Sequence, residues 1–280
     1  MNIDTAITEG TKILESNFIS SAKLDSEILL AKVINKDREY LIINGNKKLE
    51  KSDFKYFKKL ILQRSFKKPI SHLTNKKFFW NSEFYVTRDT LIPRPDTELI
   101  VQNVLDLTRH KNKLNILDIG IGSGCILISI LKEKKNFIGT GIDVCKKCIN
   151  ISKINAYNLG VSSRIKFYET NVDKFNLGKY DLIVSNPPYI KKYNINNLEK
   201  DVSKYEPRLA LSGGLDGLSE IRKVIIKSSE LIKRNGKLFL EIGFDQKDKV
   251  IKLFKKEGFY INSTLKDFAN NDRCIIGTKL

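Results

Sequence analysis

A glycine-rich segment near the middle of the chain has the residue types of a cofactor-binding loop. The run Ile116-Leu117-Asp118-Ile119-Gly120-Ile121-Gly122-Ser123-Gly124 ends an apolar stretch of strand length and precedes a helical stretch. Glycines at such a junction let the backbone turn tightly and approach a ligand closely. The dinucleotide fingerprint would need glycine at Cys125, and a nucleophile elbow is excluded because Ser123 has glycine on both sides. The segment therefore predicts a loop for a nucleotide-type cofactor.

An acidic residue follows the next apolar stretch at the spacing that such cofactors require. Residues Phe137 to Ile142 are predicted to form the second strand, which ends in Asp143 about twenty residues after the glycines. A carboxylate at that point can accept hydrogen bonds from both hydroxyls of a ribose. Together the two features predict an adenosine-containing cofactor. They leave one structural alternative open, a glycine turn beside a surface aspartate.

A third motif, Asn186-Pro187-Pro188-Tyr189, comes directly after the predicted strand Tyr180 to Ser185. In an open α/β sheet ligands bind outside the carboxyl ends of the strands, so this motif is expected beside the glycine loop. Proline removes backbone donors, which leaves the Asn186 side-chain oxygen and the Pro187 carbonyl as two acceptors in a fixed place. Two such acceptors suit a planar NH2 group. A turn that only ends the strand is disfavoured by the spacing to the other two motifs.

The elements that must position these residues alternate between strand-like and helical stretches from Asp96 onward. The predicted elements are Asn115 to Ile119, Ile126 to Lys134, Phe137 to Ile142, Lys146 to Asn158, Ile165 to Tyr168, Asp181 to Ser185, Ile221 to Arg234 and Lys237 to Ile242. This alternation predicts βαβ units and a parallel sheet covered by helices. Phe259 to Leu265 and Arg273 to Thr278 have no helix between them, which predicts a terminal antiparallel pair.

The chain is expected to contain more than one domain. Residues 1–73 are predicted to form a small helical domain, because apolar residues recur at helical spacing there. Aromatic-rich runs on either side of Asn81-Ser82 predict a β-hairpin linker over residues 74–95, and residues 96–280 the catalytic domain. The connection that follows Tyr189 is predicted to be a long loop that helps to bind the substrate.

Composition and charge narrow the classes of function. A chain of 280 residues with 41% hydrophobic and 29% charged residues is ordinary for a globular protein and excludes fibrous and largely disordered classes. No apolar run approaches the roughly 18 residues of a membrane span, and the first ten residues lack the features of a signal peptide, so we expect no membrane contact and a cytoplasmic location. The net charge of +18 comes mostly from lysine, with 40 Lys and 10 Arg spread along the chain. That spread favours a compositional bias over a nucleic-acid surface, although contact with RNA stays open.

These motifs resemble class I methyltransferases that use S-adenosylmethionine and act on conjugated amino nitrogens. Three further stretches are similar to the PrmC/HemK family, the N5-glutamine methyltransferases of peptide chain release factors. They are Leu91-Ile92-Pro93-Arg94-Pro95-Asp96-Thr97-Glu98, Tyr205-Glu206-Pro207-Arg208-Leu209-Ala210-Leu211 and Lys68-Pro69-Ile70-Ser71-His72-Leu73. The resemblance covers nearly the whole chain. The segment that contains Pro93-Arg94-Pro95 is more specific than Asn-Pro-Pro-Tyr, which DNA adenine and RNA guanine methyltransferases share.

The resemblance implies a fold, a reaction and a set of site residues. The fold is a Rossmann-like, mostly parallel seven-stranded sheet with an antiparallel C-terminal hairpin. The reaction is transfer of a methyl group from S-adenosylmethionine to the glutamine of a Gly-Gly-Gln loop in class I release factors, in support of translation termination, by a protein that acts as a monomer. The implied catalytic and substrate-binding residues are Asn186, Pro187, Pro188 and Tyr189. The implied cofactor-binding residues are Asp118, Ile119, Gly120, Ile121, Gly122, Asp143, Asn171 and Asn186.

Three weaker signals have no settled role in the sequence. The family usually has an acidic residue and then an apolar one near the adenine, where this chain has Thr170-Asn171. Arg94 is equally compatible with reaching the cofactor and with anchoring the linker. Cys145 and Cys148 have the spacing of metal ligands, but without a second pair we expect ordinary thiols and no metal.

Two other functions remain as alternatives. A methyltransferase acting on adenine N6 or on a ribosomal RNA base would use the same amino-group chemistry and would suit the basic composition. Such an enzyme needs a flipped base and a recognition domain, and no stretch of the sequence has the length for that domain. A catalytically idle binding protein on the same fold is disfavoured by the intact Asn-Pro-Pro-Tyr motif.

Overall fold

The computed structural model describes all 280 residues, which divide into two units. The first unit contains Met1–Lys76 together with Glu199–Tyr205, and the second contains Lys77–Leu198 together with Glu206–Leu280. Each unit has a hydrophobic core of its own. The short segment at 199–205 therefore belongs with the helices at the start of the chain, although it is distant from them in sequence.

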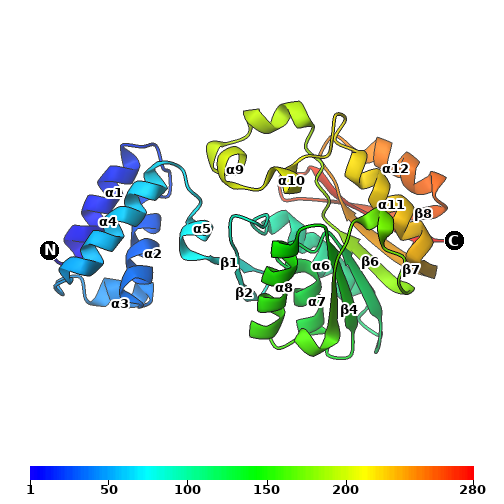
Figure 1. The fold of residues 1–280 in the computed structure, drawn as a ribbon, viewed down its shortest axis with the longest axis horizontal. Coiled ribbons are helices and arrows are strands. Elements are labelled where there is room, and N and C mark those ends of the chain that lie inside the picture. The colour runs from blue at the N-terminus through cyan, green and yellow to red at the C-terminus, as the bar shows by residue number, and fades with distance from the viewer. The chain divides into compact units, whose positions relative to one another are not determined.

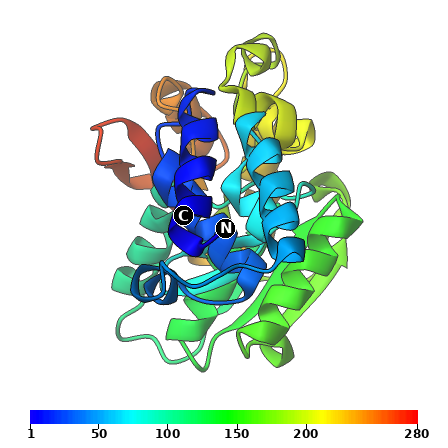
Figure 2. The same cartoon turned by 90° about the vertical axis from the view of Figure 1, so that its left-hand side faces the viewer.

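The first unit is built from helices only. They are α1 (Ile3–Glu15), α2 (Ala22–Ile34), α3 (Arg38–Ile43), α4 (Lys51–Ser65), α5 (Ile70–Thr74) and α9 (Lys200–Tyr205). Asn2 caps α1, since its side chain accepts a hydrogen bond of 2.8 Å from the Thr5 amide. The apolar faces of α1 and α4 meet at buried side chains such as Leu14, Phe57 and Ile61, and Figure 2 shows these two helices as neighbours in dark and light blue. The helical periodicity of the sequence thus becomes the core of a small bundle.

The second unit contains a seven-stranded sheet. Its strands are β3 (Asn115–Ile119), β4 (Ile138–Asp143), β5 (Ile165–Glu169), β6 (Tyr180–Ser185), β7 (Ile232–Glu241), β8 (Phe259–Lys266) and β9 (Asp272–Lys279). Their order in space is β5-β4-β3-β6-β7-β9-β8. The five strands β3 to β7 are parallel, whereas β9 lies antiparallel between β7 and β8. The mostly parallel sheet and its antiparallel C-terminal pair are confirmed.

Helices cover both faces of this sheet (Figure 1). They are α6 (Glu98–Leu107), α7 (Cys125–Glu133), α8 (Lys146–Asn158), α10 (Arg208–Leu211), α11 (Ser219–Leu231) and α12 (Lys247–Lys256), with short 3-10 turns η1 (Pro95–Thr97), η2 (Ser162–Arg164), η3 (Val172–Lys174) and η4 (Lys192–Asn197). Successive strand residues alternate between the faces: Ile116 joins the core cluster under α6, α7 and α8, and Leu117 the cluster under α11 and α12. Burial on both sides explains the continuous apolar runs that predicted a parallel sheet.

The aromatic hairpin forms β1 (Lys76–Phe79) and β2 (Ser82–Tyr85). The sequence placed it in a linker over residues 74–95. In the structure Phe79, Phe84 and Val86 are buried in the core cluster of the second unit, and the Trp80 amide donates a 2.7 Å hydrogen bond to Glu98. Burial of aromatic side chains away from water lowers the free energy of the folded protein, and this accounts for the packing of the hairpin into that core.

Two element boundaries differ from the sequence prediction. The helix predicted over Ile221 to Arg234 ends at Leu231, and the strand predicted from Lys237 begins at Ile232. Buried Ile232 pairs with Tyr180, and the register shifts before Lys237 pairs with Leu182. Strand pairing at this position therefore overrides the helical pattern. The connection after Tyr189, predicted to be a long loop, contains η4, α9 and α10.

Candidate active site

One cavity of about 370 Å³ lies at the carboxyl ends of the parallel strands. Its wall is formed by the segments that follow β3, β4, β5 and β6, by the segment before α6 and by one face of α11. The predicted site residues that line it are Ile119, Gly120, Ile121, Gly122, Asp143, Asn171, Asn186, Pro187 and Pro188. The structure thus brings together residues from three motifs that are far apart in the sequence. Asp118 and Tyr189 do not line the cavity.

The glycine loop leaves open space at the cavity wall. Gly120 and Gly122 have φ angles of +76° and +56°, which lie in the left-handed region that favours glycine. A Cβ atom would meet nothing within 4 Å at Gly120 and only a backbone oxygen at 3.9 Å at Gly122. The backbone itself therefore forms the surface here, and a ligand can approach its amides closely.

Asp118 has a buried carboxylate without a hydrogen-bond partner. The residue is 1% exposed, and neither of its carboxylate oxygens is bonded within the protein. Burial raises the pKa of Asp118 from 3.8 to about 7, the backbone amide of Leu127 acts in the opposite direction, and the nearby charge of Asp143 adds to the rise. Native proteins rarely leave a buried carboxylate unpaired. Asp118 immediately precedes the loop that lines the cavity, so it fits a site that is completed by the hydrogen-bond donors of a ligand.

Asp143 joins the end of β4 to the glycine loop. One of its carboxylate oxygens accepts a 3.0 Å hydrogen bond from the Gly122 amide, and the other accepts a 2.8 Å bond from the Cys145 amide. Burial raises the pKa of Asp143. A carboxylate oxygen has more than one lone pair, so each can still accept from a hydroxyl group in the cavity. The residues around the loop therefore fit the ribose and the methionine portion of an adenosine cofactor.

Thr170 and Asn171 stand where the family pattern has an acidic and then an apolar residue near the adenine. Both residues line the cavity, but the Asn171 side chain accepts a 3.1 Å hydrogen bond from the Asp173 amide and so caps η3. Val172 and Val144 supply apolar surface nearby in the lining. Neither valine was predicted from the sequence. Val172 could have been found from the sequence. The family pattern ends in an apolar residue, and Val172 lies one residue beyond Asn171, where that apolar residue was expected.

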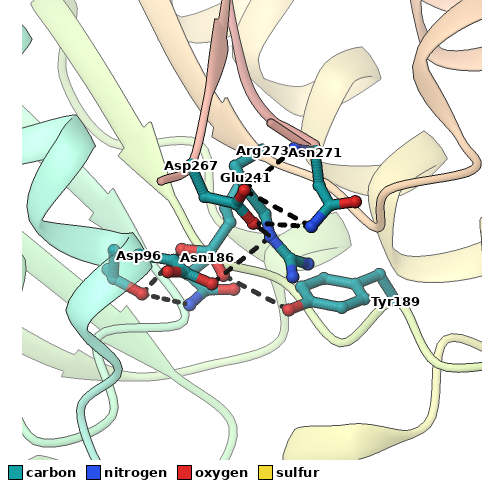
Figure 3. A network of polar contacts seen from close by, with 8 residues as sticks. Asp96, Asn186, Tyr189, Glu241, Asp267, Asn271 and Arg273 are labelled. Atoms are coloured by element: carbon teal, nitrogen blue, oxygen red, sulfur yellow. Dashed lines mark hydrogen bonds and ion pairs between the residues drawn. The ribbon is translucent and has the colours of Figure 1, made fainter. Parts of the chain in front are cut away.

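Asn186 is held by a polar network, which Figure 3 shows from close by. The residue follows β6, which lies on the other side of β3 from β4 and β5. Its Nδ2 atom donates a 3.1 Å hydrogen bond to the Thr97 hydroxyl, and that hydroxyl donates a 2.6 Å bond to Glu241. The hydroxyl of Tyr189 lies 3.4 Å from the other oxygen of Glu241. The last residue of β7 thus supports both ends of the Asn-Pro-Pro-Tyr motif. Sequence reasoning assigned no role to Thr97 or Glu241, although Thr97 lies in a motif segment.

Two of the family-like segments are joined by an ion pair. Arg94 donates to Glu206 at 2.5 Å, and the Ile92 amide donates to the other oxygen of Glu206 at 3.1 Å. Glu206 is 5% exposed, so its charge is paired inside the protein. Arg94 also lines the cavity, which means that it both anchors its segment and forms part of the wall.

Three of the four free cysteines, Cys125, Cys145 and Cys148, line the cavity. Burial raises the pKa of Cys125 to about 12 and also raises that of Cys148, so both thiols are protonated at neutral pH. The Cys148 thiol donates to the Asp89 carbonyl at 3.1 Å. No group of three or more His, Cys, Asp or Glu side chains in the structure is arranged to hold a metal ion.

The sheet order, the glycine loop and Asp143 at the end of β4 define a class I methyltransferase with S-adenosylmethionine as methyl donor. A ribosomal protein L11 methylase from Lactobacillus delbrueckii subsp. bulgaricus has the same fold, with a TM-score of 0.51 and 16% identity over 69% of this chain and 82% of its own. Two family models match, the PrmC N-terminal domain over residues 5–74 and the methyltransferase small domain over residues 95–214. The chain belongs to the release factor glutamine methyltransferase family.

Relatives of full length support this assignment. The release factor glutamine methyltransferase of Clostridium acetobutylicum is 36% identical over 100% of this chain and 99% of its own. The protein of the same name from Buchnera aphidicola subsp. Schizaphis graminum is 36% identical over the whole of both chains. The resemblance to the PrmC/HemK family is confirmed. No helix in the structure combines the length and the apolar character needed to span a membrane.

Proposed function

We propose that this protein transfers a methyl group from S-adenosylmethionine to the side-chain amide nitrogen, N5, of the glutamine in the Gly-Gly-Gln loop of class I release factors. The observation that carries the proposal is the position of Asn186 in the cavity wall with its Nδ2 atom already bonded to Thr97. The Oδ1 atom of Asn186 is left as an acceptor for an NH2 group. The activity supports translation termination.

The residues of the Asn-Pro-Pro-Tyr motif would prepare the amide for reaction. An amide nitrogen is a poor nucleophile, because its lone pair is delocalised into the carbonyl. Asn186 Oδ1 and the Pro187 carbonyl would accept hydrogen bonds from the two N–H groups of the substrate amide. They would also stabilise the positive charge that develops on its nitrogen. Pro188 fixes the backbone of the loop, and Tyr189 supports it through Glu241. S-adenosylmethionine supplies an electrophilic methyl group on its sulfonium.

The other half of the cavity would hold the cofactor. Asp118 and the amides of the loop from Ile119 to Gly122 would bind the methionine portion, and Asp143 would accept from the ribose hydroxyls. Asn171 would lie at the adenine, with apolar contact from Val172. The arrangement requires no catalytic metal, because a methyl group on a sulfonium is already electrophilic. As the N–CH3 bond forms the S–CH3 bond breaks, a neutral thioether leaves, and the methylated nitrogen gives up one proton to solvent.

The same acceptors would give selectivity for glutamine over glutamate. Glutamate offers no N–H donors, so Asn186 Oδ1 and the Pro187 carbonyl would stay unpaired beside a carboxylate. An unpaired buried acceptor costs free energy, and two acceptors facing a negative charge repel it. Release factors with glutamate at this position should not be substrates.

The first unit would dock the body of the release factor, and the protein would act in the cytoplasm as a monomer. Nucleic-acid contact through the basic surface is not needed for the reaction. The test is to incubate the protein with labelled S-adenosylmethionine and either a purified class I release factor or bulk nucleic acid. Label in the release factor supports the proposal. Label in the nucleic acid alone would overturn it in favour of a nucleic-acid methyltransferase.

A further inference from the structure

The chain of polar contacts behind Asn186 starts at a buried carboxylate that does not touch the cavity. Glu241 is the last residue of β7 and is 2% exposed, and Thr97 is also 2% exposed. Glu241 Oε2 accepts from the Thr97 hydroxyl at 2.6 Å, and Thr97 Oγ1 accepts from Asn186 Nδ2 at 3.1 Å. Figure 3 labels Glu241 and Asn186 in this network. Three groups from β7, η1 and the segment after β6 thus form one line of hydrogen bonds.

The charge of Glu241 determines which group donates in each of these hydrogen bonds. An ionised carboxylate can only accept, so the single hydrogen of the Thr97 hydroxyl must point toward Glu241. Thr97 Oγ1 can then only accept from Asn186, which fixes Nδ2 toward Thr97 and leaves Oδ1 for the substrate. A protonated Glu241 could donate to Thr97 instead. The Thr97 hydrogen would then be free to bond Asn186 Oδ1, and the amide would turn its NH2 group toward the substrate.

We propose that Glu241 and Thr97 are positioning residues that determine which atom of the Asn186 side-chain amide, Oδ1 or Nδ2, points toward the substrate. This inference rests on the methyl-transfer function proposed above. With Oδ1 presented, Asn186 accepts from a substrate NH2 group. With Nδ2 presented, two NH2 groups face each other and binding of the amide is lost. The protonation of one buried carboxylate therefore controls turnover without contact with substrate or cofactor.

The groups around Glu241 allow it to act in this way near neutral pH. Burial raises the pKa of Glu241 to about 7. Arg273 of β9 lowers the pKa of Glu241, and Asp96 of η1 raises it. Arg273 itself forms ion pairs with Asp96 at 3.3 Å and with Asp267 at 2.8 Å. Tyr189, Cys274 and Cys125 also face Glu241, and the pKa of each is raised by burial, so all three are neutral. Glu241 is thus the group in this cluster whose charge changes around pH 7.

The kinetic test measures kcat with a release factor at saturating cofactor, so that titration of the cofactor site does not contribute. Glu241→Gln and Thr97→Val should each lower kcat by about tenfold to a hundredfold, because they leave the Asn186 amide free to turn. Thr97→Ser keeps the hydroxyl and should restore most of the rate. Thr108→Val is the matched control, since the hydroxyl of buried Thr108 bonds only to backbone carbonyls, those of Val104 and Leu105, near the end of α6. The wild-type rate should fall as the pH drops through about 7, and Glu241→Gln should lack this fall.

A spectroscopic test separates this inference from the proposed function. In the free protein the Asn186 side-chain NH2 signal, assigned by its loss in Asn186→Ala, should shift with a midpoint near pH 7 and should stop shifting in Glu241→Gln. Calorimetric binding of S-adenosylmethionine would show that each variant is folded. A shift that persists in Glu241→Gln, or wild-type kcat in both Glu241→Gln and Thr97→Val, would overturn the inference. A titrating signal in a protein that labels no release factor would overturn only the proposed function.

Discussion

The two halves of the cavity differ in how complete they are before any ligand binds. On the side of β3 and β4, the Asp118 carboxylate has no partner, and the glycine backbone forms an open surface. On the side of β6 and β7, Asn186 already belongs to a continuous network that ends at Glu241. We propose that the donors of the cofactor complete the first half. The other is organised in advance by the protein.

This difference predicts which kinetic quantity each half controls. Groups whose hydrogen bonds are formed only with the ligand contribute to binding. Substitutions of these groups should therefore change the dissociation constant of the cofactor. Groups that are fixed in advance toward developing charge contribute mostly to the rate of the chemical step.

Replacement of Asn186 should have the largest effect. Asn186→Ala removes an acceptor of developing charge and should lower the rate of methyl transfer at least about 10²- to 10³-fold. Asn186→Asp keeps an acceptor but places a charge near the sulfonium and should also be impaired. Both variants should fold, because a segment after a strand contributes little to the core. Single-turnover kinetics with calorimetry of cofactor binding would check this, and a large loss of affinity with normal transfer would break the division.

Replacement of Asp143 should act on binding. Asp143→Ala should weaken cofactor binding by about 1.5 to 3 kcal/mol, since charge-assisted hydrogen bonds to the ribose are lost. Asp173→Ala is the matched control, because Asp173 is an exposed aspartate of the neighbouring η3 that does not line the cavity. Calorimetry gives both dissociation constants. Equal affinity in the wild type and Asp143→Ala would remove Asp143 from the cofactor site.

Asp118 should link stability to pH. Because its pKa is about 7 in the folded protein and 3.8 is its ordinary value, the folded state holds a proton that the unfolded chain releases. The contribution of this group to stability is therefore lost as pH rises from about 4 to 7. Asp118→Asn should raise the Tm of the free protein at pH 8 and raise it less at pH 5, while it weakens cofactor binding. A lower Tm at pH 8, measured by scanning calorimetry, would contradict the unpaired carboxylate.

The smallest effect is expected for the two cysteines near Asp143. The double change Cys145→Ser with Cys148→Ser should leave methyl transfer essentially unchanged, because no chemistry depends on these thiols. Activity is measured together with the zinc content of the purified protein. Loss of activity accompanied by loss of zinc would mean that this part of the cavity has a metal site.

Much of the fold and the cofactor half followed from local patterns. Apolar runs of strand length, glycines at a strand-to-helix junction and an acid at the end of β4 each carry their signal within a few residues. Asn186 was found because proline and asparagine after a strand are informative together. These features depend on neighbours in sequence, which is what a single sequence records.

The network behind Asn186 could not be found in this way. Thr97 and Glu241 are 144 residues apart, and nothing in either segment indicates the other. A glutamate at the end of an apolar strand is also typical of a solvent-exposed edge, whereas Glu241 is buried by η1 and β9. The start of β7 was missed for a related reason, since pairing with Tyr180 decides it. Contacts between residues far apart in sequence determine both the burial of Glu241 and the first residue of β7. Local hydrophobic periodicity gives no information about such contacts.

The position of the methyl group on the product tests the proposed function without further assumptions. The wild-type protein, a class I release factor and S-adenosylmethionine are incubated, and the digested release factor is sequenced by mass spectrometry. We predict one added methyl group on the side-chain nitrogen of the Gly-Gly-Gln glutamine, and none in release factors with alanine or glutamate at that position. Methylation of those two variants, or of another residue in the wild-type factor, would contradict the account.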